Sequence, residues 1–255
     1  MSSKKTIIMP DISNIELKND SNKFDTFIRD YWKYYLMLEE EFMDTFKYVE
    51  FSKDNYKTFS VEYLKLFQVV CSEIDVVGKA MAGEIYGLVH KKFVARDANI
   101  HKWWFALQNN YQIFEDGDTE LLKDKSVKIN EMYELKPWRG YVVEQCRTSN
   151  KNADGETTRE YIRLKQNSNG KLVSKTPSWW IAYNDVKHQR TTLIKGDSKT
   201  NFSKANLWNL CNAFSALYIL EWSYISTIGN SVQITGLDYS ELFEGKPKSA
   251  RFGSF

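Results

Sequence analysis

The sequence FSVEYLKLFQVVCSEIDVVGKAMA, at residues 59–82, repeats apolar side chains every three or four positions. This spacing places them on one face of an α-helix, because successive turns bring positions three and four apart into line. We therefore predict a long amphipathic helix that buries one face. The stripe consists of Phe59, Tyr63, Leu66, Val70, Ile74, Val77 and Met81.

A second stripe with the same period comes earlier in the chain and predicts another long helix. The acidic residues 39–41 lie largely off this stripe, and the polar stretch 52–57 separates the two helices. Two long helices with a short connection pack most simply as an antiparallel hairpin. The second stripe consists of Phe24, Ile28, Tyr31, Tyr35, Leu38, Phe42 and Val49.

A third helical pattern, at residues 98–114, leads into a region of different character at 115–175. This region alternates short β-prone segments with clusters of turn-forming residues. The polar stretch 150–158 contains Asp154-Gly155, and a further cluster ends in Asn169-Gly170. Both dipeptides suit tight turns. We predict a small β-containing insertion between helices.

Helical character returns after the insertion. Thr176 suits the N-cap of a helix and Pro177 its first position, so we predict a helix that runs to about Arg190. A last long helix is predicted at 203–228. The fold class that follows is mainly α, an antiparallel helical bundle with the β-containing insertion.

The chain is therefore expected to divide into five parts. The bundle is built from residues 23–114 and 176–243, and the insertion at 115–175 separates these two parts. Polar residues at 1–22 and 244–255 predict a flexible N-terminal arm and a flexible tail.

Composition narrows the classes of function. Aromatic residues make up 15% of the chain, which argues against a disordered protein. The net charge of +2 gives no long-range attraction to nucleic acid or to a lipid surface. The three cysteines show no CxxC spacing and read as reduced thiols. No apolar run reaches membrane-spanning length and the polar N-terminus does not resemble a signal peptide, so we expect a cytoplasmic protein without membrane contact.

Common local motifs are absent from the sequence. The histidines His90, His101 and His188 share no metal-ligand spacing, and neither a P-loop, GxGxxG nor GxSxG occurs. We therefore expect no metal and no cofactor.

One polar cluster could carry chemistry. On the helix at 176–190, Asn184 and His188 lie four positions apart on one face, with Trp180 a turn earlier. An imidazole there could move a proton near neutral pH, and the Asn184 amide could orient it or hold a phosphate oxygen. Lys187 and Arg190 supply positive charge for a phosphate.

Two further acids could support this cluster. Glu73 or Asp75, on the helix at 59–82, could face His188 across the bundle and tune it. Simpler explanations exist for all of these residues. The helix dipole favours basic residues in a last turn whatever the function, and Asp75 with Lys79 has the spacing of an ordinary surface pair.

The residues of this cluster resemble the HEPN superfamily. The resemblance rests on Tyr183-Asn184-x-x-Lys187-His188, on the preceding Ser178-Trp179-Trp180, on Ala205-Asn206-Leu207 and on the stretch 71–79. It implies a helical bundle, often dimeric. Many members are metal-independent ribonucleases of toxin–antitoxin, abortive-infection or CRISPR systems. The resemblance makes His188 the catalytic histidine and Asn184 the polar position before it.

The sequence departs from the family at one position. Ile181, Ala182 and Tyr183 occupy the places where the family has an arginine. Either Lys187 or Arg190 supplies that charge, or the protein is a non-catalytic member.

Three functions from different classes follow. The first is an RNA-cleaving effector of bacterial stress or antiviral defence, in which the RNA 2′-hydroxyl attacks, His188 is acid or base and a homodimer completes the site. The second is a non-catalytic module that binds a nucleotide or a partner protein such as an antitoxin or defence subunit. A purely structural interaction module is a third. A nuclease should expose His188 in a basic cleft, whereas a scaffold should bury it.

Overall fold

The computed structural model describes most of the chain between residues 20 and 243. The predicted tail, and the predicted arm as far as residue 19, lie outside the described residues. Residues 20–22 of that arm already belong to the first helix, because the Asp20 side chain caps it by accepting from the backbone N–H groups of Asn22 and Lys23. The described ranges are 20–88, 93–108, 110, 112–115, 118–129, 133–152, 155–229 and 231–243.

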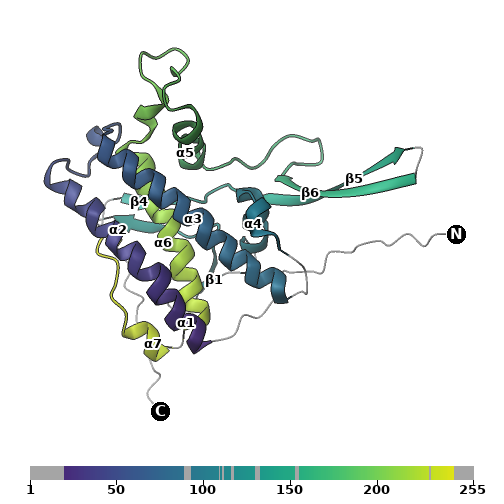
Figure 1. Ribbon diagram of the computed structural model, residues 1–255, viewed down its shortest axis with the longest axis horizontal. Helices are drawn as coiled ribbons and strands as arrows, with labels where there is room; N and C mark the ends of the chain where they lie inside the picture. Colours follow the sequence, from purple (N-terminus) through teal and green to yellow (C-terminus); the bar gives the residue numbers. More distant parts are fainter. Residues whose placement is uncertain are drawn as a thin grey trace.

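The chain begins with one long, composite helical segment. It comprises α1 (Ser21–Phe27), a π-helical turn η1 (Ile28–Trp32), α2 (Lys33–Asp44) and a 3₁₀ turn (Thr45–Lys47). The first predicted helix is thus confirmed. In Figure 1, α1 and α2 run antiparallel to α3 (Val61–Leu88). This is the second predicted helix, which begins two residues later and ends six residues later than the predicted range 59–82.

The π-helical turn changes which face of the first segment is buried. It takes one residue more per turn than an α-helix, so the buried position moves from Ile28 and Tyr31 to Phe27 and Trp32. The prediction for Ile28 and Tyr31 was only half right, since both are partly buried. The prediction that Glu39 lies off the stripe was wrong, because that residue is 2% exposed.

The central element is α6 (Leu207–Ile228), which packs along α3 and is buried on almost every side. It begins later than predicted, because a 3₁₀ turn (Asn201–Lys204) comes first and Asn206 caps the helix by accepting from the Asn209 N–H. A short helix, α7 (Ser231–Thr235), follows it. The sequence did not predict α7.

The third predicted helix is too long by about two turns. Helix α4 covers only Ile100–Leu107, and Phe114 lies in the strand β1 (Gln112–Glu115). The helix ends where Asn110 turns its side-chain amide back to the Ala106 carbonyl, at 2.6 Å. Asparagine side chains compete in this way with backbone hydrogen bonds and favour chain turns over helix.

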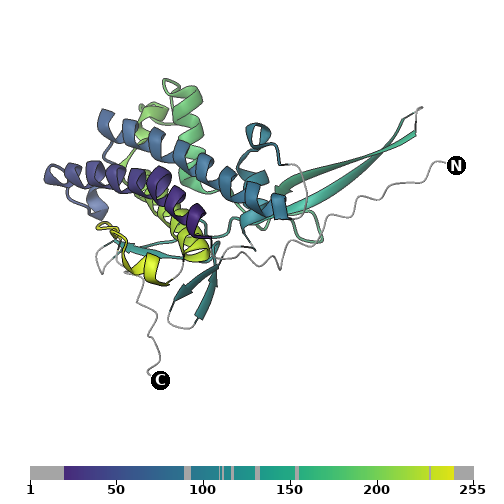
Figure 2. The same ribbon diagram turned by 60° about the horizontal axis from the view of Figure 1, so that its bottom comes forward.

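The β region consists of separate antiparallel pairs in the described part of the chain. Strand β1 pairs with β2 (Asp118–Leu121), and β3 (Val127–Ile129) pairs with β4 (Tyr133–Leu135). The third pair, β5 (Val143–Asn152) with β6 (Gly155–Leu164), extends away from the helices in Figures 1 and 2. We call this pair the β-arm. The predicted insertion is confirmed as short strands, in a chain that is mainly helical.

Two predicted turns of this region had different outcomes. In the polar stretch 150–158, residues 150–152 and 155–158 are strand, because β5 and β6 pair residue by residue up to Asn152 and Gly155. Asp154 of the predicted Asp154-Gly155 turn lies outside the described residues. The Asn169-Gly170 turn is confirmed: Gly170 has a φ of 73°, and the chain pairs again at Gln166 and Leu172.

The base of the β-arm is fixed to α4 by one side chain. The Gln108 amide donates to the Val143 carbonyl at 2.8 Å and accepts from its N–H at 3.0 Å. Gln108 is buried, so these two bonds replace the neighbouring strand that the arm lacks at this point.

The helix that carries the predicted site is α5 (Ser178–Gln189). Pro177, predicted as its first residue, is instead its N-cap, with an extended ψ of 134°. Thr176 therefore does not cap the helix.

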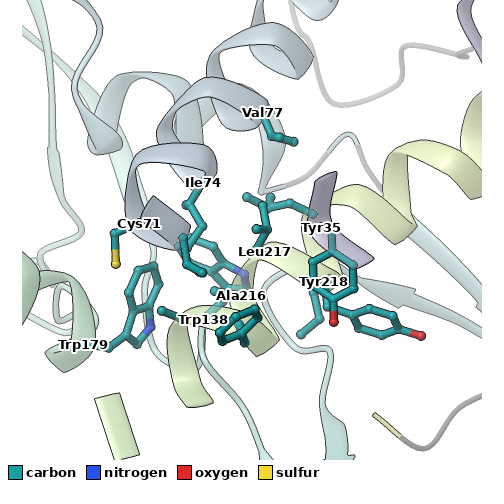
Figure 3. Packing of buried hydrophobic residues seen from close by; sticks show 14 of the residues in the cluster. Tyr35, Cys71, Ile74, Val77, Trp138, Trp179, Ala216, Leu217 and Tyr218 are labelled. Carbon is teal, nitrogen blue, oxygen red and sulfur yellow. The ribbon is translucent and has the colours of Figure 1, made fainter. Parts of the chain in front are cut away.

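A continuous apolar core joins these elements. Figure 3 shows Ile74 and Val77 of α3 beside Leu217 of α6, with Trp138 and Trp179 next to them. Trp179 is held by a hydrogen bond from its indole N–H to the Pro137 carbonyl, at 3.0 Å. This tryptophan fixes α5 against the core. Among the described residues, no helix is both long and apolar enough to cross a membrane.

Candidate functional site

Helix α5 packs against the core through an apolar stripe. Trp179, Ala182, Tyr183 and Val186 are buried, and the Tyr183 ring meets Phe67 of α3 edge to face. Burial raises the pKa of Tyr183 to about 12, with smaller contributions from Cys71 and Asp75. The phenol of Tyr183 is therefore protonated at neutral pH.

His188 lies in the last turn of α5 and is exposed. Lys187 and Arg190 are exposed on either side of it. Within the described ranges none of the three has a carboxylate at ion-pair distance. His188 is thus exposed between two cations, but it does not line the pocket described below, so the basic cleft of the nuclease hypothesis stays a prediction.

The Asn184 side chain does not orient His188. Its amide nitrogen donates to the carbonyl of Trp180, one turn back in α5, at 3.0 Å. Trp180 is itself mostly buried, so it does not share an open face with His188.

The two supporting acids point to different places. Asp75 is held within its own helix and by α4, since Lys79 donates to one carboxylate oxygen at 2.5 Å and the Trp103 indole N–H to the other at 3.0 Å. Glu73 is half-buried, and burial raises its pKa. Burial, and then the charge of Glu73, raise the pKa of Tyr31 and of Glu221. Glu73 therefore lies near Tyr31 of η1 and Glu221 of α6, and it is not part of the pocket wall described next.

A pocket of 390 Å³ brings several of the predicted residues together. It opens between α3, α4 and α5, and its walls include Asp75, Trp180, Asn184 and Lys187. His188 and Arg190 do not line it. The histidine of this pocket is His101, from the first turn of α4.

Sequence reasoning missed His101. Its ring nitrogen Nδ1 lies 2.6 Å from the hydroxyl of Tyr141, which precedes β5 and is fully buried. Burial lowers the pKa of His101 and raises that of Tyr141, so both are neutral at neutral pH. No spacing in the sequence connects His101 of α4 with Lys187 at the end of α5. Only the packing of the two helices shows that both residues line one pocket.

Lys187 is the cation of the pocket. Its Nζ lies over the Tyr183 ring, 5.3 Å from the centroid. The acidic residue of α5, Asp185, does not pair with Lys187, because its carboxylate accepts a hydrogen bond from Lys204 at 2.6 Å. An uncompensated ammonium beside neutral hydrogen-bonding groups suits an anionic ligand. No group of three or more potential metal-binding side chains occurs in the part of the chain that the structure describes.

Comparisons with protein-family models, curated proteins and solved structures found no match for this chain.

Proposed function

We propose that this protein is a HEPN-like, metal-independent endoribonuclease that acts in the bacterial cytoplasm as an effector of stress or phage defence. The observation that supports the proposal best is the exposed His188 between Lys187 and Arg190. An imidazole exchanges protons near neutral pH, and two cations beside it attract the phosphate backbone of RNA.

The proposed reaction needs only groups of the RNA and of two protein copies. His188 of one copy accepts the proton of the 2′-hydroxyl, whose oxygen attacks the adjacent phosphorus. The bond from phosphorus to the 5′ oxygen breaks, and His188 of the second copy donates a proton to that oxygen. The products are a 2′,3′-cyclic phosphate and a 5′-hydroxyl. Lys187 and Arg190 stabilise the charge that develops on the phosphoryl oxygens.

The test is cleavage of RNA by the purified protein in the presence of a chelator. We expect His188→Ala to lower the rate by about 10²- to 10⁴-fold, because that is the usual contribution of a general acid or base. Gln189→Ala is the matched control, since Gln189 is exposed on the same turn. Full activity of His188→Ala, or a strict need for a divalent metal, would contradict the proposal.

Induced expression in bacteria, with growth and RNA integrity measured, tests the effector role independently. Growth arrest with degraded RNA, abolished by His188→Ala at equal protein level, supports an effector. Sedimentation at the assay concentration tests the homodimer.

A second function has its own observation in support. The pocket between α3, α4 and α5 lies apart from His188, and no arginine precedes that histidine on α5. A non-catalytic member that binds a nucleotide or a partner protein fits both features. Binding without RNA cleavage would favour it.

A further inference from the structure

The pocket between α3, α4 and α5 has the dimensions of a small-ligand site. Its volume of 390 Å³ lies within the range of roughly 300–1,000 Å³ that such sites occupy. Three helices form its walls, with Asp75 from α3, His101 from α4, and Asn184 and Lys187 from α5. Each is on a helix that packs against the core, so the site is preformed.

The charged side chain of the pocket wall that is left for a ligand is the cation Lys187. Asp75 is the acid in its wall, and both of its oxygens already accept, one from Lys79 and one from Trp103. Lys187, in contrast, has no carboxylate at ion-pair distance among the described residues. An anion therefore gains a cation here without meeting an uncompensated carboxylate.

The hydrogen bond between His101 and Tyr141 assigns the tautomer of the imidazole. The Tyr141 phenol keeps its proton because burial raises its pKa. Its hydroxyl lies 2.6 Å from Nδ1 of the ring, and the described residues offer it no other hydrogen-bond acceptor. Tyr141 thus donates to Nδ1, and the neutral ring carries its proton on Nε2. His101 can then donate that proton in a hydrogen bond to a phosphate oxygen.

Asn184 adds an acceptor next to the cation. One N–H of its amide is used by the Trp180 carbonyl. This leaves the amide oxygen and the second N–H for a ligand. Sugar hydroxyls donate to such an oxygen, and the neighbouring Tyr183 and Trp180 supply apolar wall.

We propose that this pocket binds a nucleoside monophosphate unit. The phosphate lies between Lys187 Nζ and His101 Nε2, and Asn184 accepts from a ribose hydroxyl. Tyr141 is a positioning residue, since it acts only through His101. If the bound unit is part of an RNA strand, the inference rests on the proposed function. If the unit is a free nucleotide, the inference does not depend on RNA cleavage.

The test is calorimetric titration of the full-length protein with AMP, adenosine and inorganic phosphate. We expect AMP to bind at least about tenfold more tightly than either fragment, since only AMP uses both halves of the site. Lys187→Gln should weaken AMP binding about tenfold or more, as loss of a charge-assisted hydrogen bond does. Lys195→Gln is the matched control, because Lys195 is exposed on a loop outside the pocket wall.

Tyr141→Phe tests the assigned tautomer. It should weaken AMP binding about three- to tenfold. It should also alter the ¹⁵N shifts of the His101 ring, which report the nitrogen that carries the proton. A purely structural role of Tyr141 would leave those shifts unchanged. Circular dichroism shows whether each variant is folded. If Tyr141→Phe does not fold, Lys187→Gln still tests the proposal.

The outcomes separate this inference from the nuclease proposal. No AMP binding at millimolar concentration, equal binding of AMP and inorganic phosphate, or binding unaffected by Lys187→Gln would each overturn the inference, even if His188-dependent RNA cleavage occurs. AMP binding that needs Lys187 supports it, even if RNA is never cleaved. Displacement of AMP by a short single-stranded RNA identifies RNA as the source of the ligand, and its absence identifies a free nucleotide.

Discussion

Gly78 of α3 lies where the Trp103 ring packs directly on the helix backbone. A Cβ atom at this position would be 2.8 Å from two ring carbons. The ring cannot move away easily, because its N–H is held by Asp75. We predict that Gly78→Ala lowers the free energy of unfolding by about 1–3 kcal/mol, measured by urea denaturation.

Gly83, five positions along the same helix, provides the control. Its nearest neighbour for a Cβ atom is a Phe93 ring carbon at 3.8 Å, an ordinary contact. Gly83→Ala should stabilise the protein by up to about 1 kcal/mol, since alanine favours helix. Equal effects of the two substitutions would show that Trp103 does not pack as described.

Glu221 predicts a pH dependence of stability. It is fully buried in α6 with both carboxyl oxygens lacking a partner among the described residues, and burial, then the charge of Glu73, raises its pKa well above the ordinary 4.5. The folded state holds this proton more tightly than the unfolded state. This contribution to stability is complete below pH 4.5 and decreases as the pH rises towards the folded-state pKa.

We therefore expect Glu221→Gln, which keeps the shape and removes the titration, to be more stable than the wild type at pH 8. The advantage should shrink as the pH falls towards 4.5, with a slope of up to about 1.4 kcal/mol per pH unit. Denaturation curves between pH 4 and 8 measure it. Parallel pH profiles of the two proteins would contradict the assignment.

The candidate residues show what a sequence can indicate at this scale. Asn184 and Lys187 were predictable as neighbours, because helical spacing alone sets their geometry. Their meeting with Asp75 and His101 was not, since it depends on how three helices pack. Glu39 was misplaced for a related reason: an acid between apolar neighbours is expected in solvent unless its partners are known.

At the scale of elements, the π-helical turn η1 predicts a tolerated deletion. A π-helical turn equals an α-helix with one inserted residue, so removing one exposed residue restores regular helix. Deleting Arg29, which is 68% exposed in its side chain, leaves Phe27 and Trp32 four positions apart and still buried on one face. We expect a folded protein, within about 2 kcal/mol of the wild type by urea denaturation.

The same deletion one helix later should not be tolerated. Met37 is also exposed, but it lies in regular α2. Removing it turns the residues beyond it by about 100° and takes Leu38 and Phe42 out of register with the core. Loss of cooperative unfolding is the expected result. If both deletions fold equally well, η1 is not the inserted turn.

Element existence was easier to predict than element limits. The long stripes at 24–49 and 59–82 were sufficient to identify their helices, because many positions repeat the same period. The π-helical turn was not visible, since an apolar stripe tolerates one shifted residue. The ends of α4 and the start of α6 depend on side-chain bonds of Asn110 and Asn206, which no periodicity reports.

At the scale of the whole molecule, the β-arm is separable from the core. It projects as an isolated two-stranded ribbon, a structure that contributes little stability in water. We predict that replacing residues 147–160 by Asn-Gly, which joins the paired Cys146 and Tyr161, changes the free energy of unfolding by less than about 1 kcal/mol.

The base of the arm should behave in the opposite way. Gln108→Ala removes both partners of the Val143 backbone and should cost about 1–3 kcal/mol or more. Urea denaturation measures both variants. A large loss on shortening the arm would show that its outer half packs on the core.

The mainly helical class and the small β region were predictable from composition and period. The outer half of the β-arm was not, because its polar residues look like a loop until the register pairs them. The homodimer, the RNA and the defence role remain predictions.

The buried Glu39 also has a mechanical consequence. Its carboxylate accepts from Tyr35 and Ser240 at 2.5 Å and from the Glu241 N–H at 2.8 Å, so the last described segment is fastened to α2. A force applied to the C-terminal end of the described chain acts on these hydrogen bonds of Glu39 before it acts on α6. In a single-molecule stretching experiment, the first extension step should therefore correspond to the breaking of the hydrogen bonds between Glu39 and residues 240–241. Glu39→Gln should lower the force at which this step occurs.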